Sequence, residues 1–237
     1  MTIKTRAKIE HRPFTGLGKA DHGWLSANHH FSFADYQDPT RMNWGSIRVW
    51  NDDEIAPQTG FPPHRHDNME IITYVREGAI THRDSMNNVG RTEAGDVQVM
   101  SAGTGVQHSE YNLEDTLCRL FQIWIIPRER GATPAWHQRQ FPKGDTSGAF
   151  TVLASGYAAD DALPINANAR VLGATLEAGG ILEYEVGDAR HAYLVIAKGK
   201  VRISDQNIVA RDGVAIGAGA LIIEAIEDSE LVMVDSE

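Results

Sequence analysis

The chain lacks several features that mark whole classes of protein. It contains a single cysteine, Cys118, so an intrachain disulfide is excluded. Its longest apolar runs, such as 121–127 and 218–223, have the length of a strand and are too short to cross a bilayer. No hydrophobic signal segment follows Met1. The sequence therefore predicts a cytoplasmic protein without a membrane anchor, in which Cys118 is a small buried apolar residue.

Positive charge is also scarce. The chain has 22 Lys and Arg against 32 Asp and Glu, a formal net charge of −10. Residues 151–237 carry 6 basic and 14 acidic side chains and so account for −8 of that total. Nucleic acids bind clustered Lys and Arg, because these displace the counterions of the phosphates. The sequence therefore predicts no direct binding to DNA or RNA, and it identifies no protein partner.

A long stretch with a helical hydrophobic period is missing as well. From about residue 45 onward, short runs rich in β-branched and aromatic residues alternate with turns rich in Gly, Asn and Asp. The predicted strands are 46–50, 69–75, 79–83, 97–100, 117–126, 150–154, 181–186, 192–196, 200–203, 213–216, 221–225 and 230–234. Many short strands at regular spacing are typical of an all-β sandwich or barrel.

The strand pattern is interrupted once and then repeats. Residues 127–148 contain three prolines and three glycines among polar residues, a composition typical of a linker. On each side of this stretch a strand is followed by a charged residue, a glycine and a second strand, at 74–80 and at 195–201. This internal repeat predicts two barrels, at residues 1–140 and 150–237, joined by a linker at 141–149.

Two pairs of polar residues in the first half have the spacing of metal ligands. His64 and His66 are two residues apart, and about forty residues later His108 and Glu110 repeat that spacing. Residues i and i+2 of a strand point to the same face, so each pair can converge on one ion. Three imidazoles and a carboxylate suit Fe, Mn, Ni, Cu or Zn. Residues 150–237 contain no His-x-His, so one metal site is predicted, in the first barrel only.

These residues lie within motifs of a known family. Residues 60–78 and 95–112 are similar to the two cupin motifs, and the chain as a whole resembles the pirin family. The matching stretches are His22–Leu25, His30–Ala34, Arg48–Asp53, Met69–Val75, Asp84–Met86, Met100–Gly105, His108–Asn112 and Gln122–Ile125. The resemblance is close over residues 15–145 and looser beyond them. It implies two cupin barrels (double-stranded β-helix, jelly roll) packed face to face.

The resemblance also implies a metal site and an activity. The four ligands of the family fall on His64, His66, His108 and Glu110. Other cupins use a glutamate of the first motif, which here is Glu70, so that alternative stays open. Bacterial pirins resemble quercetin 2,3-dioxygenases, which open flavonols with O₂ and release carbon monoxide. The expected cofactor is one divalent transition metal, with iron first and Mn, Ni, Co, Cu or Zn also open.

Two classes of function are compatible with this resemblance. In the first, a flavonol-like substrate and O₂ react at the metal, with Glu110 as the catalytic base. In the second, the chain is a non-enzymatic metal-binding redox module or transcription coregulator. A third possibility is an isomerase or another cupin activity on a small molecule. His82 lies in a predicted strand, and both a role beside the metal site and a place on the surface stay open for it.

Overall fold

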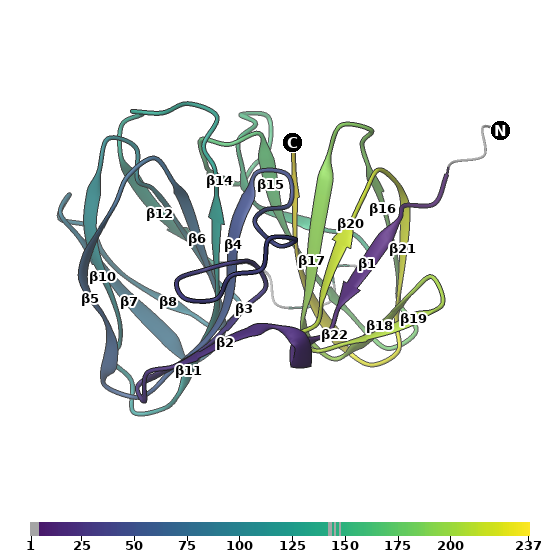
Figure 1. Cartoon of the computed structure of the whole chain (residues 1–237), viewed down its shortest axis with the longest axis horizontal. Helices are drawn as coiled ribbons and strands as arrows, with labels where there is room; N and C mark the ends of the chain where they lie inside the picture. The colour runs from purple at the N-terminus through teal and green to yellow at the C-terminus, as the bar shows by residue number, and fades with distance from the viewer. Residues whose placement is uncertain (1–4, 142–143, 145, 147) are drawn as a thin grey trace. The chain divides into compact units, whose positions relative to one another are not determined.

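The computed structural model describes residues 5–141, 144, 146 and 148–237, and its regular structure is almost all β. The only helix among these residues is a single 3₁₀ turn, η1 (Phe14–Gly16). No described helix is long and apolar enough to cross a membrane. The predicted all-β class is therefore confirmed, and each of the twelve predicted strands overlaps an observed one. The chain divides into two compact units (Figure 1).

The N-terminal unit consists of the described residues of Gly18–Pro142 and Ala154–Asn168. Its larger sheet has the order β12-β9-β6-β11-β4-β3-β2, and its smaller sheet has the order β5-β10-β7-β8. The strands of the larger sheet are β2 (Gly18–Asp21), β3 (Leu25–His29), β4 (Ile47–Ile55), β6 (Glu70–Glu77), β9 (Val97–Ser101), β11 (Cys118–Ile125) and β12 (Ala135–Arg139). The strands of the smaller sheet are β5 (Thr59–His66), β7 (Ala79–Asp84), β8 (Val89–Glu93) and β10 (Val106–Asn112).

The C-terminal unit consists of the described residues of Met1–Leu17, Lys143–Leu153 and Ala169–Glu237. Its two sheets contain β1-β20-β17-β22-β15 and β16-β21-β18-β19 as neighbours. The strands are β1 (Ile9–Arg12), β15 (Ala169–Leu176), β16 (Ile181–Val186), β17 (His191–Lys198), β18 (Lys200–Ile203), β19 (Gln206–Val209), β20 (Gly213–Ile216), β21 (Gly219–Ala225) and β22 (Ser229–Ser236). Strand β13 (Thr151–Ser155) crosses the boundary between the units, and it pairs in parallel with β14 (Leu163–Pro164).

The unit boundaries differ from the predicted domains at the N-terminus and near the middle of the chain. Strand β1, purple in Figure 1, pairs with β20 and so belongs to the C-terminal unit. Within the predicted linker stretch 127–148, residues 135–139 form β12, which pairs with β9 in the N-terminal unit. Residues 142, 143, 145 and 147 of the linker predicted at 141–149 lie outside the described residues. The pairing of its backbone decides to which unit each of these segments belongs, and the composition of a segment does not reveal that pairing.

The two interiors differ in chemistry. In the C-terminal unit, β21 lies between β16 and β18 and contributes Leu221, Ile223 and Ala225 to an aliphatic core. In the N-terminal unit, β10 has the same place between β5 and β7, but its buried residues include His108 and Glu110. A cluster of buried apolar residues, among them Cys118, also belongs to that unit. The barrel with polar residues at these positions therefore contains the candidate metal ligands.

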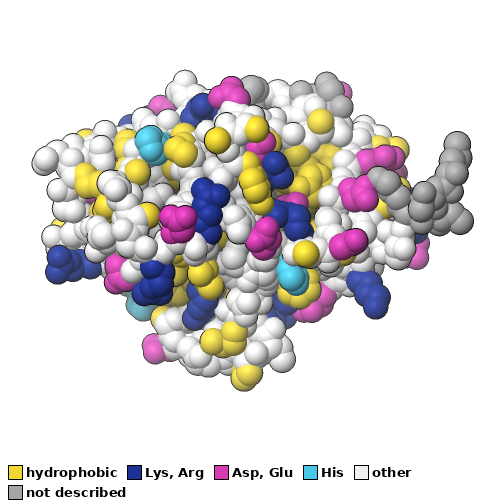
Figure 2. All heavy atoms as spheres, turned by 90° about the horizontal axis from the view of Figure 1, so that it is seen from above, with side chains coloured by type: hydrophobic (Ala, Val, Ile, Leu, Met, Phe, Trp, Pro, Cys, Tyr) yellow, Lys and Arg dark blue, Asp and Glu magenta, His cyan; other side chains and the backbone are white. Residues whose placement is uncertain are grey.

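The surface carries charges of both signs. On the face in Figure 2, Lys and Arg side chains stand among Asp and Glu side chains. Several exposed arginines form ion pairs, for example Arg91 with Glu114 and Arg202 with Glu224. Such exposed pairs contribute about 0 to 1 kcal/mol each. This face therefore presents mixed charge rather than a single basic stripe.

Alkylation of Cys118 in the folded protein is expected to be at least about a thousandfold slower than in the unfolded chain. The thiol is fully buried, and burial together with the charge of Glu110 raises its pKa from 9.0 to about 12, which lowers the thiolate fraction by about three powers of ten. Mass spectrometry after iodoacetamide treatment, with and without urea, measures the two rates. Equal rates would contradict the expectation.

Candidate metal centre

Strand β10 brings the predicted ligands together. It lies between β5 and β7, and His108 is opposite His64 on one side and Asp84 on the other. Glu110 is opposite His82 on β7. Side chains at alternate positions of these strands point into the barrel, as the sequence spacing predicts. The structure therefore places His64, His66, His108 and Glu110 on one sheet and adds His82 to them.

A bulge in β5 shapes this arrangement. Its register against β10 shifts between His108 and Glu110, so that β5 has one residue more than β10 in this interval. Pro62 and Pro63 occupy the bulge, and proline, which lacks the N–H that a ladder needs, is tolerated there and on an edge strand such as β5. Next to the bulge, a Cβ on Gly60 would lie 2.2 Å from the carbonyl oxygen of Glu110, so only glycine allows this close approach.

The three predicted histidines converge. The ring centroids are 4.4 Å apart for His64 and His108, 4.8 Å for His64 and His66, and 5.0 Å for His66 and His108. One nitrogen from each ring lies within 4.8 Å of the others. The Nδ1 of His64 donates to the carbonyl of Pro62 at 2.8 Å, which leaves its Nε2 as a lone-pair donor. The Nε2 of His108 is buried without a hydrogen-bond partner.

The electrostatics of the cluster favour neutral imidazoles. Burial, reinforced by the charges of neighbouring histidines, lowers the pKa of His66 from 6.5 to about 4. The same causes lower the pKa of His108 to about 3. A neutral imidazole has the lone pair that a metal ion needs. A buried nitrogen without a partner and three such lone pairs together fit a transition-metal ion.

Glu110 lies at the edge of this cluster. Its ligand atom groups with those of His108 and His82, rather than with those of all three predicted histidines. The side chain is 1% exposed, and its Oε1 accepts from Gln98 at 2.8 Å and from Thr73 at 3.2 Å. Its Oε2 accepts from Gln122 Nε2 at 2.7 Å. A carboxylate has about four acceptor positions, so about one, on Oε2, is free for a metal or a proton.

Glu70, the alternative fourth ligand, is engaged elsewhere. It is buried, and its Oε2 accepts from Ser101 Oγ at 2.5 Å and from the backbone N–H of Asn166 at 2.9 Å. Alternation along β6 places Glu70 and Thr73 on opposite faces, and Thr73 is one of the residues that contact Glu110. Among the described residues, Glu70 is in neither cluster of possible metal ligands.

A second carboxyl group lies in the same interior. Asp53 is 1% exposed and its Oδ1 has no hydrogen-bond partner. Burial, with the negative charges of Asp52 and Glu110, raises the pKa of Asp53 well above its ordinary value. This environment favours the protonated form of Asp53.

Aromatic residues border the histidine cluster. The ring of Trp124 is 4.9 Å from that of His66, at an interplanar angle of 80°, and 5.4 Å from that of Phe33. Phe61 contacts His64 at 6.2 Å between centroids. Trp50, in contrast, is fully buried and belongs to the core. Flat apolar surfaces therefore lie beside the cluster, where an aromatic ligand could pack.

Several residues around the cluster were not predicted from the sequence. Gln98 and Gln122 fix the carboxylate of Glu110, and His82 with Asp84 borders His108. The sequence does contain an indication that the two glutamines are functional, because each is a polar residue within an apolar strand. The exposed or buried position of His82 could not be decided from its local sequence.

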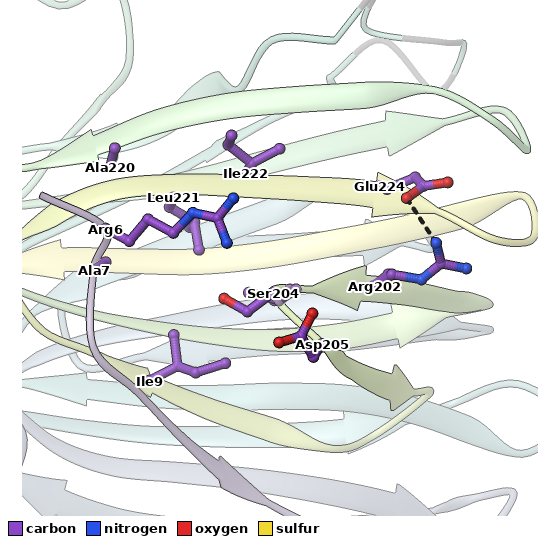
Figure 3. A pocket seen from close by; sticks show the side chains of 11 residues that line it. Arg6, Ala7, Ile9, Arg202, Ser204, Asp205, Ala220, Leu221, Ile222 and Glu224 are labelled. Atoms are coloured by element: carbon purple, nitrogen blue, oxygen red, sulfur yellow. Dashed lines mark hydrogen bonds and ion pairs between the residues drawn. The ribbon is translucent and has the colours of Figure 1, made fainter. Parts of the chain in front are cut away.

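The C-terminal unit has a pocket of a different kind (Figure 3). It lies between the N-terminal segment and strands β18 and β21, and Arg202 donates to Glu224 at 3.2 Å on its rim. Its described lining residues include Arg6, Asp205 and Ile222 and contain neither His nor Cys. This pocket therefore lacks the ligands of a transition-metal site.

The metal-free protein is expected to become less stable as the pH falls below about 6.5. His66 and His108 have folded-state pKa values of about 4 and about 3, so the unfolded chain binds protons that the folded protein excludes. The stability that the folded protein gains from keeping these histidines neutral is complete above pH 6.5. It is lost as the pH falls through the folded-state pKa values of His66 and His108. Urea unfolding at several pH values measures it, and a His66→Gln variant should show a weaker pH dependence. Identical pH profiles for parent and variant would contradict the assignment.

Comparison with known proteins relates this site to a family. Residues 9–125 match the family profile described as Pirin, and residues 152–236 match the profile described as quercetinase C-terminal cupin domain. A pirin-like protein of Caulobacter vibrioides is 61% identical over 230 residues, which cover 96% of this chain and 99% of that protein. The quercetin 2,3-dioxygenase of Escherichia coli K12 is 40% identical over 220 residues, with 92% and 94% coverage.

A solved structure has the same fold. The bacterial pirin YhhW of Escherichia coli, in complex with nickel(II), superposes with a TM-score of 0.91 at 38% identity. The match covers 97% of this chain and 99% of that one. Together with the two profiles it confirms the predicted fold of two cupin barrels.

Proposed function

Because the chain belongs to the pirin family, we propose that it is a metal-dependent quercetin 2,3-dioxygenase. It opens flavonols such as quercetin with O₂ and releases carbon monoxide. The ion is held by His64, His66, His108 and Glu110. One observation carries the proposal: three imidazoles converge beside a buried carboxylate, and the Nε2 of His108 has no protein partner. Four such ligands leave coordination positions free on a six-coordinate metal, unlike a closed structural zinc site.

Each residue of the site has a distinct task. A bound divalent metal would supply Lewis-acid activation of the 3-hydroxyl and carbonyl pair of a flavonol. When it does not occupy the free position of Oε2 as a ligand, Glu110 accepts the hydroxyl proton there, while Gln98, Gln122 and Thr73 fix the orientation of its carboxylate. Trp124 and Phe33 offer apolar ring surfaces on which a flat flavonol packs and which exclude water.

Metal content and turnover test the proposal together. The purified protein should contain one equivalent of metal per chain, measured by elemental analysis, because the C-terminal interior is aliphatic. Protein loaded in turn with Fe, Mn, Ni, Co and Cu should bleach the flavonol absorbance band. The rate of bleaching should match the rates of O₂ consumption and carbon monoxide release.

The metal-free protein is the control for this experiment, and it should leave the flavonol intact. Two equivalents of metal per chain would contradict a single site in the N-terminal unit. Absence of turnover with all five metals, in protein that does bind them, would contradict the dioxygenase and leave a non-enzymatic metal-binding role.

A further inference from the structure

A buried histidine that the proposed reaction does not use lies behind the metal site. His82 is 1% exposed and is located on β7, opposite Glu110. Its ring stacks on that of Trp136, with centroids 5.0 Å apart and an interplanar angle of 11°. Gly90 makes room for this contact, because a Cβ there would lie 2.1 Å from the Trp136 ring. The plane of the His82 imidazole is therefore fixed by packing.

The two nitrogens of His82 have different neighbours. Its Nε2 is 3.1 Å from Asp84 Oδ2, and its Nδ1 is 3.5 Å from the Nδ1 of His108. The side chain of Asp84 is fully buried, and it also accepts from the backbone N–H of Met86 at 2.9 Å and of Asn88 at 3.0 Å, and from Asn88 Nδ2 at 2.9 Å. A carboxyl group surrounded by donors acts only as an acceptor, so Nε2 of His82 carries the proton.

This assignment determines the tautomer of His108. When Nε2 of a neutral His82 carries the proton, its Nδ1 has only a lone pair and must accept. The Nδ1 of His108 is then the donor of the contact between the two rings, which is at the long end of the hydrogen-bond range. With its proton on Nδ1, His108 presents a bare Nε2, which is the atom buried without a partner.

We propose that Asp84 and His82 are positioning residues that hold His108 with its proton on Nδ1 and its Nε2 lone pair directed to the metal. This inference rests on the proposed metal site. It also explains why His82 is not itself a ligand although it lies near His108 and Glu110. Its Nε2 is occupied by Asp84 and its Nδ1 lone pair by His108, so neither nitrogen is left for an ion. Loss of such outer contacts typically weakens metal binding about 10- to 100-fold.

Two substitutions separate this role from packing. His82→Phe retains a ring against Trp136 but removes both nitrogens. Asp84→Asn is isosteric, and its Oδ1 still faces the N–H groups of Met86 and Asn88, so its amide nitrogen faces His82. His82 must then move its proton to Nδ1, and His108 must carry its own on Nε2, toward the metal. The control is Asp67→Asn, which removes an exposed carboxylate next to His66.

Zinc affinity and tautomer state are the measurements. Zn²⁺ competition with a chelator should give roughly 10- to 100-fold weaker binding for His82→Phe and Asp84→Asn, and little change for Asp67→Asn. Long-range ¹H–¹⁵N spectra of the metal-free parent should show protons on His82 Nε2 and His108 Nδ1. In Asp84→Asn the proton of His82 should appear on Nδ1 instead.

The two measurements distinguish failure of the proposed metal site from failure of the proposed role of His82 and Asp84. A parent that binds no zinc contradicts the proposed metal site, while the spectra of the metal-free protein still decide the tautomers. A proton on His108 Nε2 in the parent, or zinc affinities within about twofold in all variants, would overturn the role of His82 and Asp84. A zinc-loaded spectrum with the ion on a His82 nitrogen would overturn it as well, by making His82 a ligand.

Discussion

Replacement of His64 with alanine is expected to abolish flavonol cleavage and to remove most of the bound metal, with the metal-free fold intact. His64 supplies one of three converging imidazoles, so its loss should weaken binding by more than the roughly 100-fold typical of an outer contact. Its side chain is only half-buried on the edge strand β5, and its hydrogen bond to the carbonyl of Pro62 is local. Little packing is lost with it.

Thermal unfolding and metal analysis together measure this effect. At a metal concentration 100 times its dissociation constant, binding stabilises the folded parent by about 2.7 kcal/mol, and the variant should lack most of this increment. The metal-free forms should unfold at nearly the same temperature. The matched control is His137→Ala, because His137 is exposed on β12. Parent-like turnover by His64→Ala would remove His64 from the ligand set.

The Glu110→Gln variant is expected to lose at least about 100-fold in flavonol turnover and to retain metal less well. Glutamine has the size of glutamate but cannot accept the hydroxyl proton, and it carries one acceptor oxygen instead of two. Its amide nitrogen would face the donor groups of Gln98 or Gln122, which now point at a carboxylate. The disturbed geometry and the missing base both lower the turnover of the variant.

The Glu70→Gln variant is the control for this prediction, because Glu70 is the alternative fourth ligand. The Glu70 carboxylate accepts from Ser101 and Asn166, on the face of β6 opposite to Thr73. The metal content and turnover of the Glu70→Gln variant should therefore stay near those of the parent. Steady-state kinetics and elemental analysis of the two variants decide the fourth ligand. Loss of metal in Glu70→Gln with retention in Glu110→Gln would assign the other cupin ligand set.

The strands were predictable because their signals are local. Alternation and turn residues located β6, β9, β11 and β16 to within a few residues. The prediction of a linker at 127–148 was wrong at β12, whose residues are mostly polar and none of which is buried. Strand β12 exists because it pairs with β9, about forty residues earlier in the chain. Such pairing depends on the partner strand, which a local window does not contain.

The histidines of the site were predictable for the same local reason, since a two-residue spacing on one strand fixes a shared face. The residues that position the predicted ligands were not predictable, because Gln98, Gln122 and Asp84 come from three different strands. They meet at His108 and Glu110 only after the sheets form. The bulge at Pro62 and Pro63 likewise depends on the register of β5 against β10.

The pairing of β1 with β20 has a consequence for biosynthesis. Ile9 is paired with Ile216, so β1 has no partner strand until β20, about 200 residues later in the chain, has been synthesised. At about 5 to 20 residues per second, that interval is on the order of 10 to 40 s. During this time β1 is an unpaired strand in a nascent chain, exposed to wrong partners and to chaperones. Strand β1 is therefore synthesised well before it can pair.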